Sequence, residues 1–352
     1  MTNTDQSDSA AAAKAGRGSK ATANVTAAPL EFRNVVKRYP GAPTAAINDL
    51  SFTVPAGEVC VLVGPSGCGK TTAMRLVNRM IDMTGGSILI DEKTIGQRQP
   101  AELRREIGYV IQHVGLFPHL TINNNISTVP KLLGWDRKRM AARCEELLEL
   151  VGLPAEMGRR YPSQLSGGQR QRVGVARALA ADPPLMLMDE PFGAIDPINR
   201  ERLQNEFLRL QREIRKTIVF VTHDIDEAIK MGDRIAILRE GGELVQFDTP
   251  HRILAEPADD FVAQFVGADR GLKRLALTRL DEIELKASVD GAGGQTISSK
   301  ATLREALSLM MIEELRPVAV LDPDGNRRGY VTIELLNQSL RRARTDTGTG
   351  AA

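Results

Sequence analysis

Three short stretches of the chain are almost entirely apolar and end in glycine or polar residues. They are GEVCVLVG (57–64), PLMLMDEP (184–191) and TIVFVTHD (217–224). Uniformly apolar strands of this length are typical of a parallel sheet that is covered on both faces, whereas a strand with one wet face alternates apolar and polar residues. The pattern therefore predicts an α/β core built on a parallel sheet.

Other periodic segments add smaller parts to that core. EFRNVVKRY (31–39) and LSFTVPAGE (50–58) flank the turn-rich PGAP and indicate an antiparallel β subdomain. Residues from about 112 to 180 show helical spacing, which predicts an inserted helical subdomain. We expect these parts to form one α/β domain over residues 29–268.

The chain changes character after residue 268. We expect a linker at 269–299, a small α+β unit of strand, helix, hairpin and helix at 300–341, and disordered tails at 1–28 and 342–352. The hairpin prediction rests on the Asp-Pro-Asp-Gly turn within RPVAVLDPDGNRRGYVTI. The first residues show no apolar segment of a signal peptide.

The composition argues against several functional classes. A net charge of +2 and a single tryptophan are unlike a dedicated nucleic-acid binder. The basic segment QRQRVGVARAL fits a helix that packs Val and Ala on the core and turns Arg outward, so we expect no nucleic-acid partner. Three cysteines without paired spacing predict reduced thiols of a cytoplasmic protein. The apolar runs are too short to span a membrane, so membrane association requires a partner.

The segment GPSGCGKT (64–71) carries the strongest chemical signal. It follows a predicted strand and precedes a predicted helix, which is the context that a P-loop requires. Its glycines let backbone N–H groups close around phosphates, Lys70 would neutralise the β- and γ-phosphates, and Thr71 would ligate Mg²⁺. The predicted nucleotide-binding residues in this segment are Gly64, Pro65, Ser66, Gly67, Cys68, Gly69, Lys70, Thr71 and Thr72.

Acidic residues and a histidine end the other two apolar strands. Asp189 and Glu190 close LMLMDE, and His223 ends VTHD, at the strand ends where an open α/β sheet presents its site. We expect Asp189 in the Mg²⁺ shell and Glu190 as the general base that polarises the attacking water. A lone histidine at a strand end is more often structural, but the neighbouring P-loop and acidic pair favour a catalytic role for His223.

A second anion-binding sequence, LSGGQ, lies at 165–169. Ser166, Gly167 and Gly168 stand at the predicted start of a helix and are followed by Gln169. The unpaired N–H groups and the positive end of such a helix attract an anion, although the same residues also suit an ordinary helix N-cap. The chain thus holds two phosphate-binding sequences about a hundred residues apart.

Together with Gln112 of YVIQHVGLFP and Asp196 of GAID, these motifs follow the order found in the ATP-binding cassette (ABC) transporter ATPases. Residues 30–268 resemble that family. The resemblance implies that Tyr39 stacks on adenine. It also implies that Gln112 takes part in catalysis and in the Mg²⁺ shell, linking the nucleotide to a membrane partner, and that Asp196 works across a dimer interface.

The same resemblance accounts for the two anion-binding sequences. It implies a head-to-tail homodimer in which each ATP lies between the P-loop of one copy and the LSGGQ of the other. Ser166 and Gly168 would then contact the γ-phosphate in trans. Closure of the dimer would require the γ-phosphate, and hydrolysis would remove what holds the two halves together.

A finer resemblance concerns the transported solute. It is carried by the segments MRLVNRMIDMTGGSILID, IQHVGLFPHLTINNNISTVPKLLGW, FGAIDPINR and GADRGLKRLAL. They are similar to the ATPase subunits of quaternary-amine importers, which take up glycine betaine, choline, carnitine or proline betaine. The resemblance implies an ATPase that is bound peripherally at the cytoplasmic face of the inner membrane. Its partners would be permease subunits and an extracytoplasmic substrate-binding protein.

The C-terminal region, 280–341, resembles one cystathionine-β-synthase (CBS) motif. Relatives typically carry two in tandem, so a single motif would pair with its counterpart in the dimer. Five arginines here form either a cationic surface for anionic lipid or a solvated face. They are Arg316, Arg327, Arg328, Arg341 and Arg342.

Three other functions compete with this interpretation. A soluble ABC ATPase of DNA repair or translation usually has coiled-coil insertions or two cassettes in one chain, and the sequence shows neither. A P-loop kinase or GTPase outside the ABC family has no use for LSGGQ. An ABC import ATPase for methionine or another amino acid shares the architecture but tends to carry a different C-terminal appendage.

Overall fold

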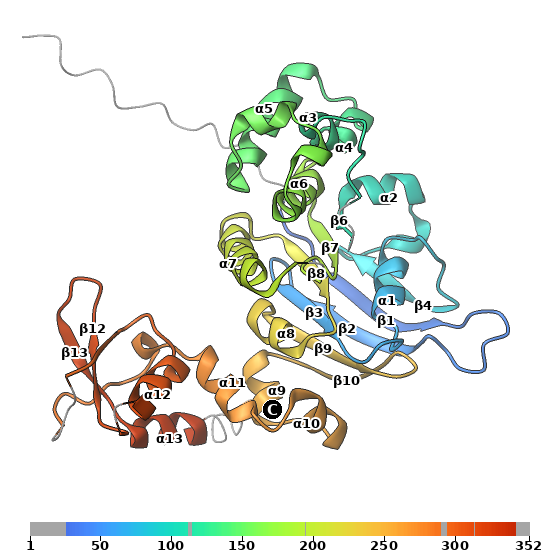
Figure 1. Cartoon of the computed structure of the whole chain (residues 1–352). Helices are drawn as coiled ribbons and strands as arrows, with labels where there is room; N and C mark the ends of the chain where they lie inside the picture. Colours follow the sequence, from blue (N-terminus) through green and yellow to red (C-terminus); the bar gives the residue numbers. More distant parts are fainter. Residues whose placement is uncertain (1–25, 112–114, 194, 290–293, 313, 343–352) are drawn as a thin grey trace, which may run out of the picture.

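The computed structural model describes residues 26–342 apart from 112–114, 194, 290–293 and 313 (Figure 1). A six-stranded sheet, called here the core sheet, has the strand order β10-β9-β3-β8-β7-β6. Strands β9, β3, β8, β7 and β6 pair in parallel, and β10 joins antiparallel at one edge. Its strands are β3 (Val59–Val63), β6 (Ile107–Val110), β7 (Leu185–Asp189), β8 (Thr217–Val221), β9 (Arg234–Arg239) and β10 (Glu243–Asp248).

Successive side chains of the central strands enter two different hydrophobic clusters. In β3, Val61 packs in one cluster, and its neighbours Cys60 and Leu62 pack in the other. In β7, Met186 and Leu187 divide between the same two clusters. Side chains alternate across a strand, so both faces of the core sheet are covered, which confirms the prediction from the apolar runs.

A four-stranded antiparallel sheet lies over one of these faces and forms the predicted β subdomain. Its order is β2-β1-β4-β5, and Phe32, Leu50 and Ile88 from three of its strands share a cluster with Leu62 of β3. The strands are β1 (Leu30–Lys37), β2 (Ile47–Val54), β4 (Gly85–Ile90) and β5 (Lys93–Thr94). Ala28, expected in the disordered tail, is buried, and its N–H donates to the Pro184 carbonyl at 3.3 Å; the folded part therefore begins before residue 29.

Four helices form the helical subdomain, which lies beyond the β6 edge of the core sheet (Figure 1). They are α3 (Ile122–Ile126), α4 (Thr128–Leu132), α5 (Arg137–Leu150) and α6 (Gly167–Leu179). The other helices of this part are α1 (Lys70–Val77), α2 (Pro100–Glu106), α7 (Pro197–Ile214), α8 (Ile225–Met231), α9 (Pro250–Ala255) and α10 (Asp260–Val266). Short 3₁₀ turns occupy Ile95–Gln97, Ala155–Arg159 and Pro162–Gln164.

The C-terminal unit has the predicted order of strand, helix, hairpin and helix. Its parts are β11 (Thr296–Ser298), α12 (Leu303–Ile312), β12 (Val318–Leu321), β13 (Arg327–Val331) and α13 (Ile333–Arg342). Strand β12 pairs antiparallel with β13 and parallel with β11. The hairpin turn is held by Asp322, whose carboxylate accepts from the N–H groups of Asp324 and Asn326 at 2.9 and 2.8 Å.

The segment expected as a linker, 269–299, is largely structured. It contains α11 (Arg270–Leu277), a 3₁₀ turn at Leu280–Glu282 and strand β11. Leu275 and Leu280 are buried in the hydrophobic core of the C-terminal unit, and α11 also packs against α9. The boundary prediction is wrong here because α11 supplies apolar surface that the small unit needs. Among the described residues, no helix is both long and apolar enough to cross a membrane.

Candidate functional site

Two of the predicted catalytic residues, Glu190 and His223, meet at one edge of the core sheet. Strands β3, β8 and β7 are adjacent and parallel, so their carboxyl ends lie side by side. The P-loop follows β3, His223 comes two residues after the end of β8, and Asp189 is the last residue of β7. This edge is where open α/β sheets bind their ligands.

Glycine is required at two positions of the P-loop. Gly64 has φ +155° and Gly69 has φ +98°. A Cβ atom would lie 2.1 Å from the Leu238 carbonyl oxygen at Gly64 and 2.4 Å from that of Ala46 at Gly69. Any other side chain would push the loop away from the neighbouring backbone, so these glycines fix the path between β3 and α1.

The Lys70 side chain is held inside the loop and is only 7% exposed. Its Nζ donates to the carbonyl oxygens of Gly64 at 2.7 Å and Pro65 at 2.8 Å, and it lies 3.6 Å from the Cys68 Sγ. The loop tip, Pro65–Gly67, faces solvent, whereas Cys68 is buried beneath it. The backbone carbonyls of the loop therefore hold the Lys70 ammonium group in place.

Asp189 and Thr71 bring two oxygen donors together beside Lys70. The Thr71 hydroxyl hydrogen-bonds the Asp189 carboxylate. Burial and the neighbouring Glu190 raise the pKa of the Asp189 carboxyl, and Arg75 and Lys70 oppose that rise. Arg75 is not among the predicted site residues, although its place in the last turn of α1, the helix that follows the P-loop, could have indicated it.

This donor set fits Mg²⁺. The ion prefers oxygen ligands and in phosphate sites is held by one or two protein groups together with the phosphates. The described part of the chain has no group of three or more His, Cys, Asp or Glu side chains placed to hold a metal by itself. Thr71 and Asp189 would therefore share the ion with a bound phosphate. Thr72, the next residue of α1, is half-buried.

Glu190 and His223 form a contact that their sequence separation hides. His223 Nδ1 lies 3.0 Å from Glu190 Oε1. The Glu190 backbone is in the left-handed region, at φ +42°, and its N–H donates to the Val221 carbonyl of β8 at 2.9 Å. Such a conformation is costly for a non-glycine residue and concentrates at functional sites. It turns the carboxylate away from the line of β7 and toward His223.

The LSGGQ segment lies apart from this edge. Ser166 is the N-cap of α6: its Oγ accepts from the Gln169 N–H at 3.3 Å, and Gln169 Oε1 accepts from the Ser166 N–H at 2.9 Å. Gly167 and Gly168 form the first turn. All four residues line a hollow of about 470 Å³ with Asp196, and no described P-loop residue lines it. Within one chain, the structure does not bring the two anion-binding segments together.

The remaining predicted residues are placed as follows. Asp196 caps α7, with its carboxylate accepting from the Asn199 N–H at 3.2 Å. Tyr39 is 39% exposed, with the Lys37 Nζ 5.0 Å from its ring centre. It lies in the turn between β1 and β2 that brings Ala46 against the P-loop. Gln112 lies outside the described residues.

Known proteins are similar to this chain in sequence and in fold. A family model described as ABC transporter matches residues 47–193. The osmoprotectant import ATP-binding protein OsmV of Salmonella typhimurium is 48% identical over 306 residues, covering 86% of this chain and 78% of OsmV. The chain belongs to the ATP-binding subunits of ABC transporters. Members of this family are ATPases.

Two relatives from Bacillus subtilis match the cassette to a similar degree. The choline transport ATP-binding protein OpuBA is 49% identical, and the glycine betaine/carnitine/choline transport ATP-binding protein OpuCA is 48% identical. Each match covers 89% of this chain and 81% of the relative. The matches extend beyond the ABC domain into the C-terminal region.

Solved structures confirm the expected fold, an α/β P-loop ABC ATPase. A dimeric bacterial ABC transporter cassette, MJ0796, superposes with a TM-score of 0.56 at 33% identity and covers 63% of this chain and 98% of its own. It has also been solved in a post-hydrolysis state bound to ADP and Pi. The cassette cbiO1 of Clostridium perfringens gives a TM-score of 0.60 at 25% identity, covering 65% of this chain and 91% of its own.

Proposed function

We propose that this cassette hydrolyses ATP to drive the uptake of quaternary-amine osmoprotectants through a membrane permease. The observation that carries the hydrolysis is the Glu190–His223 contact, which stands beside Lys70 at the carboxyl edge of the core sheet. The solute class is supported by the names of relatives that are 48–49% identical, which refer to osmoprotectant, to choline, or to glycine betaine, carnitine and choline.

The P-loop residues bind the triphosphate. Lys70 approaches the β- and γ-phosphates from inside the loop, and the exposed N–H groups of the tip surround the chain of phosphates. Thr71 and Asp189 hold Mg²⁺, which shields phosphate charge when bound. Tyr39 stacks on the adenine from the turn between β1 and β2.

Glu190 acts as the general base. Its carboxylate takes a proton from the water whose oxygen attacks the γ-phosphorus, while the bond from that phosphorus to the ADP oxygen breaks. His223 holds Glu190 Oε1 through Nδ1, which orients the carboxylate and leaves the exposed side of the imidazole directed to the γ-phosphate. Gln112 joins the site from the segment before the helical subdomain.

A second copy of the chain completes the site. Four residues at the N-terminus of α6 are exposed or half-buried and contact the γ-phosphate of the ATP that is bound to the other copy: Ser166, Gly167, Gly168 and Gln169. Asp196 shares their hollow and lies at the same interface. The homodimer thus closes around two ATP molecules and opens when the γ-phosphates leave.

The helical subdomain supplies a surface for the permease. A groove of about 900 Å³ runs between α3, α4 and α5. Phe117 and Leu132 on its walls are 42% and 59% exposed. The backbone of Phe117 is fixed by Asn125, which bonds its N–H at 2.7 Å and its carbonyl at 3.1 Å. An apolar groove with rigid walls suits a short permease helix, and this contact would hold the cassette at the cytoplasmic face of the inner membrane. A substrate-binding protein delivers the solute on the other side.

Uptake of labelled solute tests the proposal. Cells that express the cassette with its permease and binding protein should accumulate glycine betaine, choline or carnitine. A Glu190→Gln cassette, expressed at the same level, should abolish that accumulation. Equal uptake with the variant would refute the role of hydrolysis, and selective uptake of an amino acid such as methionine would refute the solute class.

A further inference from the structure

A buried carboxylate lies behind the catalytic edge and has no role in the hydrolysis proposed for that edge. Glu227 of α8 is 8% exposed. Its Oε1 accepts from Gln204 Nε2 of α7 at 2.9 Å, and Gln204 is itself only 6% exposed. The Thr222 hydroxyl also hydrogen-bonds Glu227. Burying a carboxylate without a cation in direct contact costs free energy. Glu227 is therefore kept at this position at a cost to the stability of the fold.

The hydrogen bond between Glu227 and Thr222 connects Glu227 to the backbone next to His223. Thr222 is 2% exposed and immediately precedes His223. Its N–H donates to the Leu62 carbonyl at 3.2 Å, and its Oγ1 accepts from the Asp224 N–H at 3.1 Å. A hydroxyl both donates and accepts, so Thr222 can donate to Glu227 while it accepts from the Asp224 N–H. The backbone on both sides of His223 is therefore fixed through Thr222.

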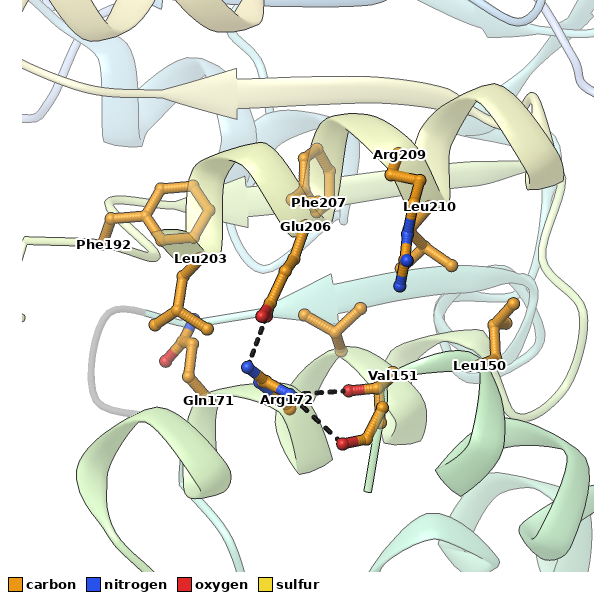
Figure 2. A pocket seen from close by; sticks show the side chains of 12 residues that line it. Leu150, Val151, Gln171, Arg172, Phe192, Leu203, Glu206, Phe207, Arg209 and Leu210 are labelled. Atoms are coloured by element: carbon orange, nitrogen blue, oxygen red, sulfur yellow. Dashed lines mark hydrogen bonds and ion pairs between the residues drawn. The ribbon is translucent and has the colours of Figure 1, made fainter. Parts of the chain in front are cut away.

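The hydrogen bond between Glu227 and Gln204 connects Glu227 to α7, the helix that begins at the proposed dimer interface. Gln204 lies on α7, which begins after its cap Asp196. Two residues beyond Gln204, Glu206 pairs with Arg172 of α6, the helix that starts at LSGGQ (Figure 2). Arg172 also donates to the Gly152 carbonyl at 3.2 Å. Helix α7 thus touches the LSGGQ helix on one side and Glu227 on the other.

Two charged groups, Asp224 and Arg200, act on the Glu227 carboxyl from these elements. Burial raises the pKa of its carboxyl, the hydrogen bonds from Thr222 and Gln204 lower it, and Asp224 and Arg200 act in opposite directions. Arg200 also donates to the Ile195 carbonyl, next to Asp196, at 3.0 Å.

We propose that Glu227 is a positioning residue for ATP hydrolysis, which fixes His223 relative to α7 by accepting from Thr222 and Gln204 together. Movement of α7, when Asp196 and the LSGGQ helix meet the second copy, then reaches His223 through one rigid contact. The inference rests on the proposed ATPase function and adds a residue that does not touch the nucleotide.

The test compares Glu227→Gln and Gln204→Leu with the matched control Gln211→Leu. Gln211 is also buried on α7, but its Nε2 donates to the carbonyls of Gly57 and Lys216 at the opposite end of the strands. With purified full-length protein, kcat should fall between about tenfold and a hundredfold in the first two variants. The KM for ATP should stay within about twofold in all three. The control should lose comparable thermal stability and keep its kcat.

A double variant shows whether Glu227 acts through His223. If it does, adding Glu227→Gln to His223→Ala should lower kcat by less than about twofold further. Full additivity, or an unchanged kcat in the Glu227 and Gln204 variants, or an equal loss in the control, would overturn the inference. A wild type without hydrolysis would instead overturn the proposed function, and this inference with it.

Discussion

The two anion-binding segments of this chain differ in how complete they are within one copy. The P-loop encloses its own cation, since Lys70 is buried and held by two loop carbonyls. Residues 166–169 of the LSGGQ segment are exposed or half-buried, and among the described contacts the Ser166 hydroxyl accepts only from the Gln169 N–H of its own helix start. The first is organised to hold a phosphate alone. The second offers an exposed helix N-terminus whose hollow is lined by no described residue of the P-loop in the same copy.

This difference assigns the two segments different tasks. The P-loop is preorganised within one chain and therefore sets the affinity for ATP. The LSGGQ segment completes a site only when two copies associate, so association depends on bound ATP. ATP bound at the P-loop supplies the anion that the second copy's LSGGQ needs, so occupancy is converted into dimerisation. Single substitutions should therefore separate binding from association, and the most damaging one removes the P-loop cation.

Replacing Lys70 with Ala should abolish both steps. Loss of the buried ammonium removes the charge that faces the β- and γ-phosphates, so kcat should fall by about a thousandfold and the Kd for ATP should rise at least about tenfold. Fluorescent-nucleotide binding and phosphate release measure the two effects. The exposed Lys93→Ala variant on β5 is the control, and comparable affinity in the two variants would contradict the assigned role of Lys70.

Replacing Glu190 with Gln should separate the steps. The amide cannot accept a proton from water, so hydrolysis should fall between about a hundredfold and ten-thousandfold, while ATP affinity is retained. The ATP-bound variant should elute as a dimer in size-exclusion chromatography and the wild type as a monomer after turnover. Glu243→Gln, at an exposed position of β10, should behave as wild type. Normal hydrolysis in Glu190→Gln would remove Glu190 from the mechanism.

Replacing Ser166 with Arg should break association alone. The monomer should bind ATP as before, because the P-loop is untouched, and should neither dimerise nor hydrolyse. Loss of the helix cap also costs about 1 kcal/mol of stability. Thr249→Ala, which removes the cap of α9, is a control for that loss and should keep full hydrolysis. An unchanged dimer in Ser166→Arg, measured in the Glu190→Gln background, would show that Ser166 does not lie at the dimer interface.

The smallest effect is expected for Lys273→Met, far from both segments. Lys273 Nζ donates to the Val266 carbonyl at 2.8 Å and pairs with Asp226 at 3.1 Å and Asp269 at 3.2 Å. Its loss should lower the free energy of unfolding by about 1–3 kcal/mol and leave ATP affinity unchanged. Chemical denaturation measures this against the exposed Lys300→Met. A fall in ATP affinity would show that α11 acts on the P-loop as well.

The sequence predicted the residues at the catalytic edge better than the buried residues that hold them in place. Because apolar runs specify parallel strands and parallel strands end at one edge, the residue pattern alone is enough to expect Lys70, Asp189 and His223 together. The pairing of Gln204 with Glu227 could not be expected in this way, since a glutamine and a glutamate on two amphipathic helices carry no periodic signal. The linker prediction failed at α11 because its apolar residues complete the core of a unit that begins later in the chain.

The most direct test of the shared ATP is a crystal structure of the Glu190→Gln variant with Mg²⁺ and ATP. We expect a head-to-tail dimer with two nucleotides, each contacted by Lys70 of one copy and Ser166 of the other. A nucleotide held by Lys70 whose γ-phosphate faces solvent, or faces a surface of the second copy without Ser166, would contradict it.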